Sequence, residues 1–557
     1  MPGIFKRHSP RAGYRVFAAI PGLLPSKAKM DIQALKTVSV LMLAAAPAAL
    51  AADHPPVGPF ETAAPLAAHG KIDELVFNQW KKLDIQPAYA CSDEVFLHRA
   101  YLDVIGTLPT AEEAAQFLKS QDPDKRPALI DRLLERDEFA DYWAMRWSEL
   151  LRVKSEFPIN LWPNAVQAYY RWIHTSLANN LPYDRFARQL LVSNGSNFRV
   201  PEVNFYRAVQ SKEPPALAQT VALTFLGART EKWPPARVND MAAFFSQVGY
   251  KGTDEWKEEI VYFDESKSAP RAAVFPDGKP ARIVPGQDPR AVFADWLLAP
   301  GNPWFARNAV NRVWYWLLGR GIVQEPDDIR PDNPPANPEL LAYLEHELVA
   351  GHYDLKHIYR LILNSQVYQL SSLPAANLPS SAQPEAAAQF AWYPVRRLDA
   401  EVLIDAVCQI TGTTEEYESL IPEPFTFLPE GQRSIALPDG SISSAFLDMF
   451  GRPPRDTGLA SERNNRPTAE QRLHLLNSSH VQLKIQQSTK LRTLMQATAK
   501  PRDPIDRLYL TVLSRYPTDD ELKTVAAYFQ SVQGNKWPAA VDLTWALINS
   551  SEFLYRH

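Results

Sequence analysis

The residues from Asn302 to Pro335 contain the pattern that most limits the fold of this chain, because they specify one short helix with marked ends. Asn302 is a favoured N-cap residue, and Pro303 suits the first helical position, where no amide donor is needed. One apolar residue recurs every four positions and gives a single buried stripe: Phe305, Ala309, Val313 and Leu317. Gly319 is the flexible residue expected just after a helix end. The segment therefore predicts a short amphipathic helix followed by a loop.

The composition of the whole chain is also consistent with short helices separated by loops. Hydrophobic residues make up 46% and charged residues 22% of the 557 residues, which is typical of a globular protein. The chain contains 48 prolines, and proline favours helix ends and rigid loops over long uninterrupted elements. A chain of this length has room for about three domains of ordinary size. We therefore expect a mainly α protein with two multi-helical domains and a small β insertion between them.

The N-terminal region predicts export. Residues Lys36 to Ala51 combine a basic residue, a short apolar run and a small-x-small end, which is the pattern of a signal peptide. We interpret residues 30–51 as that signal peptide and residues 1–29 as a mis-assigned upstream segment, because a signal peptide starts near its initiator Met. No later apolar run has spanning length, so we expect no stable membrane span after cleavage. The predicted location is the periplasm or the exterior.

The net charge limits the kinds of partner that we expect, and the cysteine count limits the possible disulfides. Removing residues 1–51 leaves 52 basic and 62 acidic residues, a net charge of −10, which argues against a nucleic-acid partner. Only two cysteines are present, Cys91 and Cys408, and the sequence leaves open whether they pair after export.

The predicted order of domains follows changes in composition along the mature chain. Residues 52–70 are rich in Pro and Ala and are expected to be a flexible lead-in. A helical domain is expected over 71–250. Residues 251–284 contain short β-prone runs separated by Ser, Pro and Asp-Gly, which indicates the β insertion. The second helical domain is expected over 285–557.

Two stretches of the sequence resemble each other and indicate an internal repeat. RAYLDVIGTLPTAEEAAQFL begins at Arg99, and RLYLTVLSRYPTDDELKTVAAYF begins at Arg507. Each places a Thr with capping-box spacing directly after Pro, Thr110 in one stretch and Thr518 in the other, and each is followed by a helix ending in Glu-Phe. Amphipathic helices can resemble each other by chance, but these shared landmarks favour duplication of a packing module.

Several blocks of the sequence resemble one family. The blocks are VFLHRAYLDVIGTLPT, SNGSNF, VNFYRA, FLGA, AAFF, NPWFARNAVNRVW, RRLDAEVLIDAV, FGRPPRDT, SERNNRPT and LHLLN. They are similar, in this order, to the paired planctomycete-specific cytochrome-type domain and its companion, the domains of unknown function 1549 and 1553. The resemblance covers residues 71–557. It implies a secreted or periplasmic protein, in many relatives joined to a separate haem-binding cytochrome domain.

Two cysteine sites of the resembling family are missing from this chain. Relatives place Cys-x-x-Cys-His after the Phe-Leu-Gly block, where the thiols could hold haem and the His could ligate its iron. This chain has Ala228 to Trp233 in that place, and it has Leu459 and Ser461 where relatives tend to carry two further cysteines. Our hypothesis is that both sites serve one centre, a haem or another metal, which this chain has lost. No haem, metal or other cofactor is therefore predicted.

A cluster of polar residues is the candidate functional site. Its predicted members are Arg307, Asn311, Arg312, Asp327, Asp328, Arg330, Glu462 and Arg463. Structural ion pairs outnumber active sites among buried polar clusters, so pairing within a helix-loop clamp is the favoured interpretation. Convergence of these side chains in an open cleft would favour an enzyme, whereas burial in mutual ion pairs would favour a scaffold.

The sequence leaves open whether the protein is an enzyme. The family blocks without their cysteines favour an exported binding or assembly component, with a periplasmic enzyme or a cytochrome as its partner. The alternatives are a hydrolase that acts on an extracellular polymer and a redox partner of a cytochrome. Six aromatic residues could stack on sugar rings, although aromatic residues at helical spacing more often belong to a core: Trp143, Trp147, Trp162, Tyr169, Tyr170 and Trp172.

Overall fold

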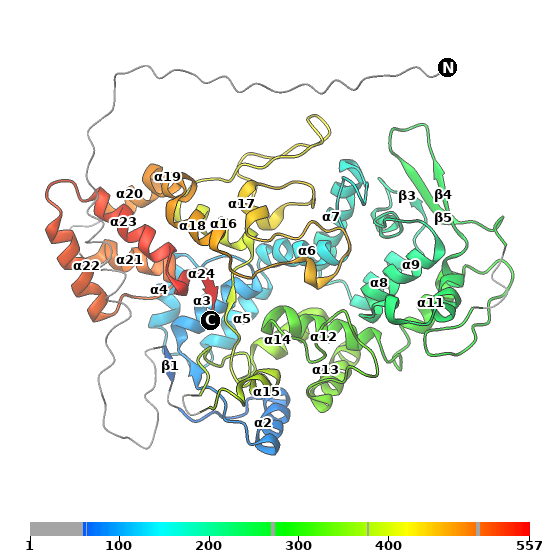
Figure 1. Cartoon of the computed structure of the whole chain (residues 1–557), viewed down its shortest axis with the longest axis horizontal. Coiled ribbons are helices and arrows are strands. Elements are labelled where there is room, and N and C mark those ends of the chain that lie inside the picture. Colours follow the sequence, from blue (N-terminus) through cyan, green and yellow to red (C-terminus); the bar gives the residue numbers. More distant parts are fainter. Residues whose placement is uncertain (1–59, 63, 269–272, 376–377, 497–501) are drawn as a thin grey trace, which may run out of the picture. The chain divides into compact units, whose positions relative to one another are not determined.

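The computed structural model describes residues 60–62, 64–268, 273–375, 378–496 and 502–557 (Figure 1). Helices dominate this part of the chain and the strands are short, so the predicted mainly α fold is confirmed. The predicted upstream segment, the predicted signal peptide and the start of the lead-in lie outside the described residues. In the ranges given above, no helix is long and apolar enough to cross a membrane.

The helices are short and are separated by many turns, as the proline content predicts. The first part of the chain forms β1 (Glu61–Thr62), α2 (Lys71–Leu83), β2 (Ala90–Cys91), α3 (Asp93–Val104), α4 (Ala111–Lys119), α5 (Lys125–Leu134), α6 (Asp137–Leu150), α7 (Pro163–Ala178), α8 (Tyr183–Val192), β3 (Gly195–Ser196), η1 (Pro201–Tyr206), α9 (Pro214–Val221), η2 (Ala222–Leu226), η3 (Thr230–Lys232), α10 (Pro235–Ala242), η4 (Ala243–Phe245), β4 (Val248–Gly252) and β5 (Glu259–Phe263). The remainder forms α11 (Pro289–Leu297), α12 (Phe305–Leu318), α13 (Pro338–Ala350), α14 (Leu355–Leu363), α15 (Gln383–Ala388), β6 (Arg396–Arg397), α16 (Ala400–Thr411), η5 (Ser434–Ala436), α17 (Ala445–Met449), η6 (Ala460–Glu462), α18 (Ala469–Asn477), α19 (Ser479–Gln487), α20 (Thr489–Gln496), α21 (Arg502–Leu513), α22 (Asp519–Ser531), α23 (Trp537–Ile548), α24 (Ser551–Leu554) and β7 (Tyr555–Arg556).

Helix α12 shows how local sequence sets the helix ends. Its predicted start at Pro303 is wrong, because the helix begins at Phe305. Asn302 nevertheless caps the first turn, since its side-chain oxygen accepts hydrogen bonds from the amides of Trp304 (3.0 Å) and Phe305 (3.2 Å). At the other end Gly319 adopts a φ of +68°, as its predicted role requires. The whole apolar stripe of this helix is buried.

The β structure near the predicted insertion is a three-stranded antiparallel sheet. Strands β4 and β5 form a hairpin in which Tyr250 pairs with Val261, and β3 pairs with the other edge of β5. The hairpin begins at Val248, slightly before residue 251 where the insertion was expected. Within the predicted lead-in, β1 pairs with β2, so that Glu61 lies opposite Cys91.

The internal repeat in the sequence is also a repeat in the structure. Thr110 and Thr518 each form a complete capping box with the Glu three residues later. Four residues before these caps, Gly106 and Ser514 both occupy the left-handed region, with φ of +60° and +57°. The two loops therefore share a backbone conformation that L-residues rarely adopt.

A third segment, from Leu361 to Tyr368, shares the turn that ends the second copy. Ser365 and Ser550 each donate to the carbonyl three residues earlier, at 2.6 and 2.7 Å. Asn364 and Asn549 each donate to the carbonyl four residues earlier, both at 2.9 Å. The sequence likeness of these segments thus reflects one local hydrogen-bond arrangement.

The two copies of the repeat pack against each other. Figure 1 shows the C-terminal helices α21 to α24 beside α3 and α4, and α21 packs on α4. The His98 Nδ1 and Ser514 Oγ atoms lie 3.0 Å apart, and the Arg99 side chain donates to the main-chain carbonyl of His557 at 2.8 Å. The end of the chain is thereby fixed to the first copy.

Gly106→Ala is expected to destabilise the fold. A Cβ atom at this position would lie 2.6 Å from Cδ2 of Tyr142, and the left-handed backbone adds about 1–2 kcal/mol for a residue with a side chain. Gly301→Ala is the matched control, because a Cβ there has no heavy atom within 4 Å. The measurement is the urea midpoint by circular dichroism. Equal midpoints for the two variants would contradict this account of the loop.

Candidate functional site

Arg312 and Asp327 form the centre of the predicted polar cluster. The Arg312 Nη2 and Asp327 Oδ1 atoms lie 2.7 Å apart, and the two side chains are only 3% and 1% exposed. The second carboxylate oxygen of Asp327 accepts a hydrogen bond from the amide of Ala460 at 2.7 Å. Asp327 therefore links α12 to η6, the turn that leads into Glu462 and Arg463. The side chains of Arg312 and Asp327 therefore meet in the interior of the protein.

The other cluster members on the α12 side have separate partners. Asn311 donates to the carbonyl of Val323 at 3.0 Å and accepts from its amide at 2.8 Å, so its side-chain amide serves the loop backbone. Arg307 points elsewhere and pairs with Glu345 of α13 at 2.7 Å. Neither side chain joins the contact between Arg312 and Asp327.

The loop after Asp327 carries a second, more exposed group of charges. Asp328 pairs with Lys232 at 2.9 Å and with Arg330 at 3.1 Å. Arg330 also pairs with Asp332 at 2.5 Å. Lys232 and Arg330 together hold the pKa of Asp328 below its ordinary value, although partial burial acts in the opposite direction.

Glu462 and Arg463 point into different surroundings. The Arg463 guanidinium lies between two carboxylates, 2.5 Å from Glu149 and 2.8 Å from Glu401. Glu462 accepts from the amide and hydroxyl of Thr457, both at 2.7 Å, through one oxygen, while its other oxygen is buried and has no hydrogen-bond partner in the described structure. Burial raises the pKa of Glu462.

Sequence reasoning missed the largest ionic group, which surrounds Asp399. Its carboxylate lies 2.5 Å from Arg146 of α6, 2.9 Å from Arg556 of β7 and 3.4 Å from Arg463. Asn465 also donates to it at 2.7 Å. Burial alone would raise the pKa of Asp399, but the three guanidinium groups outweigh it and hold the pKa well below its ordinary value.

The sequence block RRLDAEVLIDAV did indicate that a buried ionic group exists. It places Asp399 and Glu401 beside apolar residues that must be buried, and buried carboxylates need cationic partners. The partners lie far away in sequence, so the block could not identify them. Arg463, a predicted member of the cluster, is the residue that connects Asp399 with Glu401.

Residues next to the two positions where the resemblance leads us to expect cysteines both contact one loop. The carbonyl of Gly227, just before the first position, accepts from the amide of Ile329 at 2.8 Å. Ala460, between Leu459 and Ser461, donates to Asp327. Both segments therefore contact the loop that follows α12.

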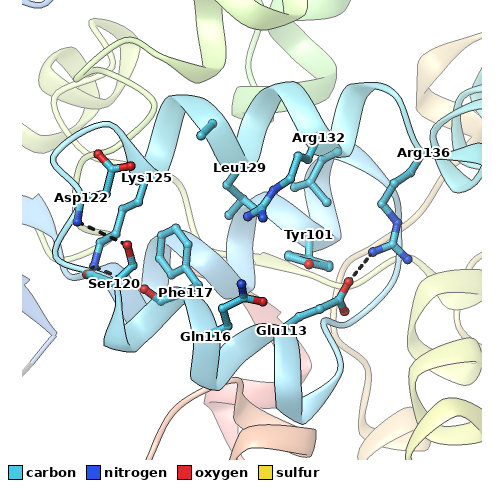
Figure 2. Close-up of a pocket in the computed structure, with 12 residues that line it drawn as sticks. Tyr101, Glu113, Gln116, Phe117, Ser120, Asp122, Lys125, Leu129, Arg132 and Arg136 are labelled. Atoms are coloured by element: carbon cyan, nitrogen blue, oxygen red, sulfur yellow. Dashed lines mark hydrogen bonds and ion pairs between the residues drawn. The ribbon is translucent and has the colours of Figure 1, made fainter.

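The described structure contains two neighbouring pockets on another part of the surface. The first, of about 440 Å³, lies between α4 and α5, and Figure 2 shows Phe117 and Leu129 inside it with Gln116 and Arg132 at its edge. The second, of about 350 Å³, is lined by residues of α16 and of the loop around Arg433. The two pockets share Glu113 and Arg136.

Five exposed apolar side chains and the half-buried Trp162 lie on three loops. Together they are Phe157, Trp162, Trp256, Leu420, Phe425 and Phe427, which we call the aromatic patch. The Trp162 ring lies 6.5 Å from that of Trp256 and 5.4 Å from that of Phe425. Phe157, Trp256, Leu420, Phe425 and Phe427 are exposed. Of the six aromatic residues considered for sugar stacking, Trp143, Trp147 and Tyr169 are core residues, as their helical spacing favoured.

The comparisons with known proteins place the chain in a family. The family model described as "Protein of unknown function (DUF1549)" matches residues 71–242. The model described as "Protein of unknown function (DUF1553)" matches residues 289–529. The chain carries both domains. No curated protein and no solved structure matches it. The resemblance inferred from the sequence blocks is thus confirmed, and both descriptions leave the activity undefined.

The described residues bring together no group of three or more His, Cys, Asp or Glu side chains that could hold a metal ion. Cys91 and Cys408 are both free thiols, the first buried and the second partly exposed. Burial raises the pKa of the Cys408 thiol to about 11, so this thiol is neutral near pH 7.

Asp399→Asn is expected to destabilise the protein by about 3–5 kcal/mol, because it removes the one carboxylate that Arg146, Arg463 and Arg556 share and leaves an excess of buried positive charge. The pKa of Asp399 is depressed in the folded state, so its contribution is complete above the ordinary value of 3.8 and is lost as pH falls through the folded pKa. The urea midpoint of the wild type should therefore fall with acidification below about pH 4, and that of the variant should fall less.

The control for this variant is Glu74→Gln, which removes an exposed pair with Lys71. Such a pair contributes about 0–1 kcal/mol, and its loss should leave the midpoint nearly unchanged. An Asp399→Asn protein as stable as the control would show that the buried group around Asp399 is not needed for the fold.

Proposed function

We propose that this protein is an exported binding or assembly component of a periplasmic system and that a periplasmic protein is its partner. The observation that carries the proposal is that Arg312, Asp327 and Arg463 of the candidate cluster are buried in ion pairs. Arg312 and Arg463 each contact carboxylates in the interior, where a substrate has no access. Such pairs fix the arrangement of helices and loops.

Two further observations support the loss of a centre that relatives carry. Residues next to the positions of the missing cysteines both contact the loop after α12, which suits one shared centre in relatives. In this chain the same loop is held by Asp327, which accepts from Ala460, and by Ile329, which donates to Gly227. The contact between these segments is therefore made without thiols.

The aromatic patch is the surface that we assign to the partner. Groups of exposed apolar side chains mark interaction surfaces, and five members of the aromatic patch are exposed. Lys257 lies 5.4 Å from the Trp162 ring and 5.2 Å from the Trp256 ring, so the patch carries a cation at its edge. Aromatic side chains with such a rim are enriched at the centres of protein–protein interfaces.

The test uses the mature protein and a double variant, Trp256→Ser with Phe425→Ser. Wild-type protein should form a complex of fixed stoichiometry with one component of the native periplasm, measured by size-exclusion chromatography with light scattering. The double variant should weaken the complex at least tenfold, because two exposed rings of the patch are removed. Leu473→Ser, which alters an exposed apolar residue outside the patch, is the matched control. A complex that is unaffected by the double variant would contradict the proposal.

A hydrolase is the second candidate, and Glu462 is the observation that favours it. A carboxyl group with a raised pKa and an unpaired oxygen has properties that a general acid needs. The hydrolase hypothesis expects wild-type protein to release soluble fragments from a dye-linked cell-envelope polysaccharide and expects Glu462→Gln to reduce release at least a hundredfold. Our proposal expects no release by either protein, and release by the wild type alone would contradict it.

A further inference from the structure

Arg136 and Arg515 occupy matching environments in the two copies of the repeat. Arg136 pairs with the capping-box Glu113 at 2.8 Å and with Glu138 at 2.5 Å. Arg515 pairs with the corresponding carboxylates of the second copy, at 2.8 and 2.6 Å. Each guanidinium also lies near the ring of the Tyr two residues after the start of its repeat, at 5.8 and 5.5 Å. The arginines come from different loops, so the fold has produced the same environment twice.

The two arginines differ in what covers them. The ring of Phe60 lies 5.1 Å from the Arg515 guanidinium, and the Arg515 side chain is only 5% exposed. Phe60 is held there because its carbonyl accepts from the amide of Ser92 at 2.9 Å and because β1 pairs with β2 directly after it. The side chain of Arg136 is 32% exposed.

Instead of a covering ring, Arg136 has a pocket on each side. Arg136 and Glu113 line both pockets described above, and Figure 2 shows their ion pair at one end of the first pocket. Small residues, among them Ser120 and Ala128, also line the first pocket and leave it open.

The matching positions of the second copy carry larger side chains. Counted from the capping Thr of each copy, Ser120 corresponds to Tyr528. Counted back from the Glu-Phe pair that follows each copy, Ala128 corresponds to Asp542. The Tyr528 hydroxyl donates to Asp542 at 2.5 Å and joins α22 to α23. Where the first copy has Ser120 and Ala128 beside a pocket, the second copy thus has two larger side chains that contact each other.

We propose that Arg136 binds an aromatic side chain of a partner polypeptide, in the place that Phe60 has on Arg515. This inference rests on the proposed binding function and adds a second contact surface to it. The two carboxylates hold the guanidinium plane in place before binding, so little ordering cost is added. An aromatic ring gains both cation–π attraction and burial in a pocket with an apolar interior.

The test uses a synthetic peptide with the sequence of residues 58–64, GPFETAA, because this segment carries the ring that covers Arg515. The peptide, acetylated, amidated and labelled with fluorescein, is titrated with the mature protein and followed by fluorescence anisotropy. Binding should weaken at least fivefold when Phe in the peptide is replaced by Ala, because one cation–π contact and one buried ring are lost.

The location of binding is tested with variants of the protein. Gln116→Trp places a bulky group at the edge of the first pocket and should weaken binding at least tenfold. Thr524→Trp changes the matching exposed position of the second copy and should leave binding unchanged. Arg136→Gln removes the cation and should also weaken binding, provided that its thermal midpoint shows it to be folded.

Three results would overturn the inference: no binding at 1 mM peptide, binding that is indifferent to the Phe replacement, or binding that Gln116→Trp leaves unchanged. A periplasmic complex that depends on the aromatic patch would then still support the proposed function. If the peptide binds as expected and no such complex forms, the proposed function fails while the aromatic site at Arg136 remains.

Discussion

Asp399 holds guanidinium groups that reach it from three distant parts of the chain, Arg146 in α6, Arg463 after η6 and Arg556 at the C-terminus. None of these charges could be buried alone without a large desolvation cost, so each depends on the others being in place. This requirement couples the first domain to the end of the second. The burial of Arg556 and the short β6–β7 pairing fix the C-terminal segment, which in turn fixes the second copy of the repeat against the first.

The repeat explains how two similar helical units came to have different surfaces. Both copies retain the capping box, the left-handed loop residue and an Arg between two carboxylates. In the second copy Phe60 covers Arg515, and Tyr528 contacts Asp542. The first copy has kept space at the same place. Duplication allows this kind of divergence, because one copy can supply stability while the other changes its surface.

The sequence predicted well what depends on neighbouring residues. The capping boxes at Thr110 and Thr518 and the left-handed Gly319 all follow from local hydrogen bonding and backbone preference. The group around Asp399 could not be predicted, because its arginines are separated from it by many residues and only the tertiary fold brings them together.

For the candidate cluster, too, the sequence predicted the members but not their tertiary contacts. Its members share one sequence block, yet the structure separates Arg307, which contacts α13, from Arg312, which contacts Asp327. Spacing along α12 could indicate different helix faces but not which neighbour each face would meet.

Hydrogen bonds of Asp327 hold the loop after α12 to the turn at η6. Asp327 is bound on one side by the guanidinium of Arg312 and on the other by the amide of Ala460, and both hydrogen bonds involve a charged group in a dry interior. These bonds alone join α12 to the turn that carries one of the two cysteine positions. If relatives use their thiols to hold a centre beside this loop, removing the centre leaves the bridge made by Asp327 intact.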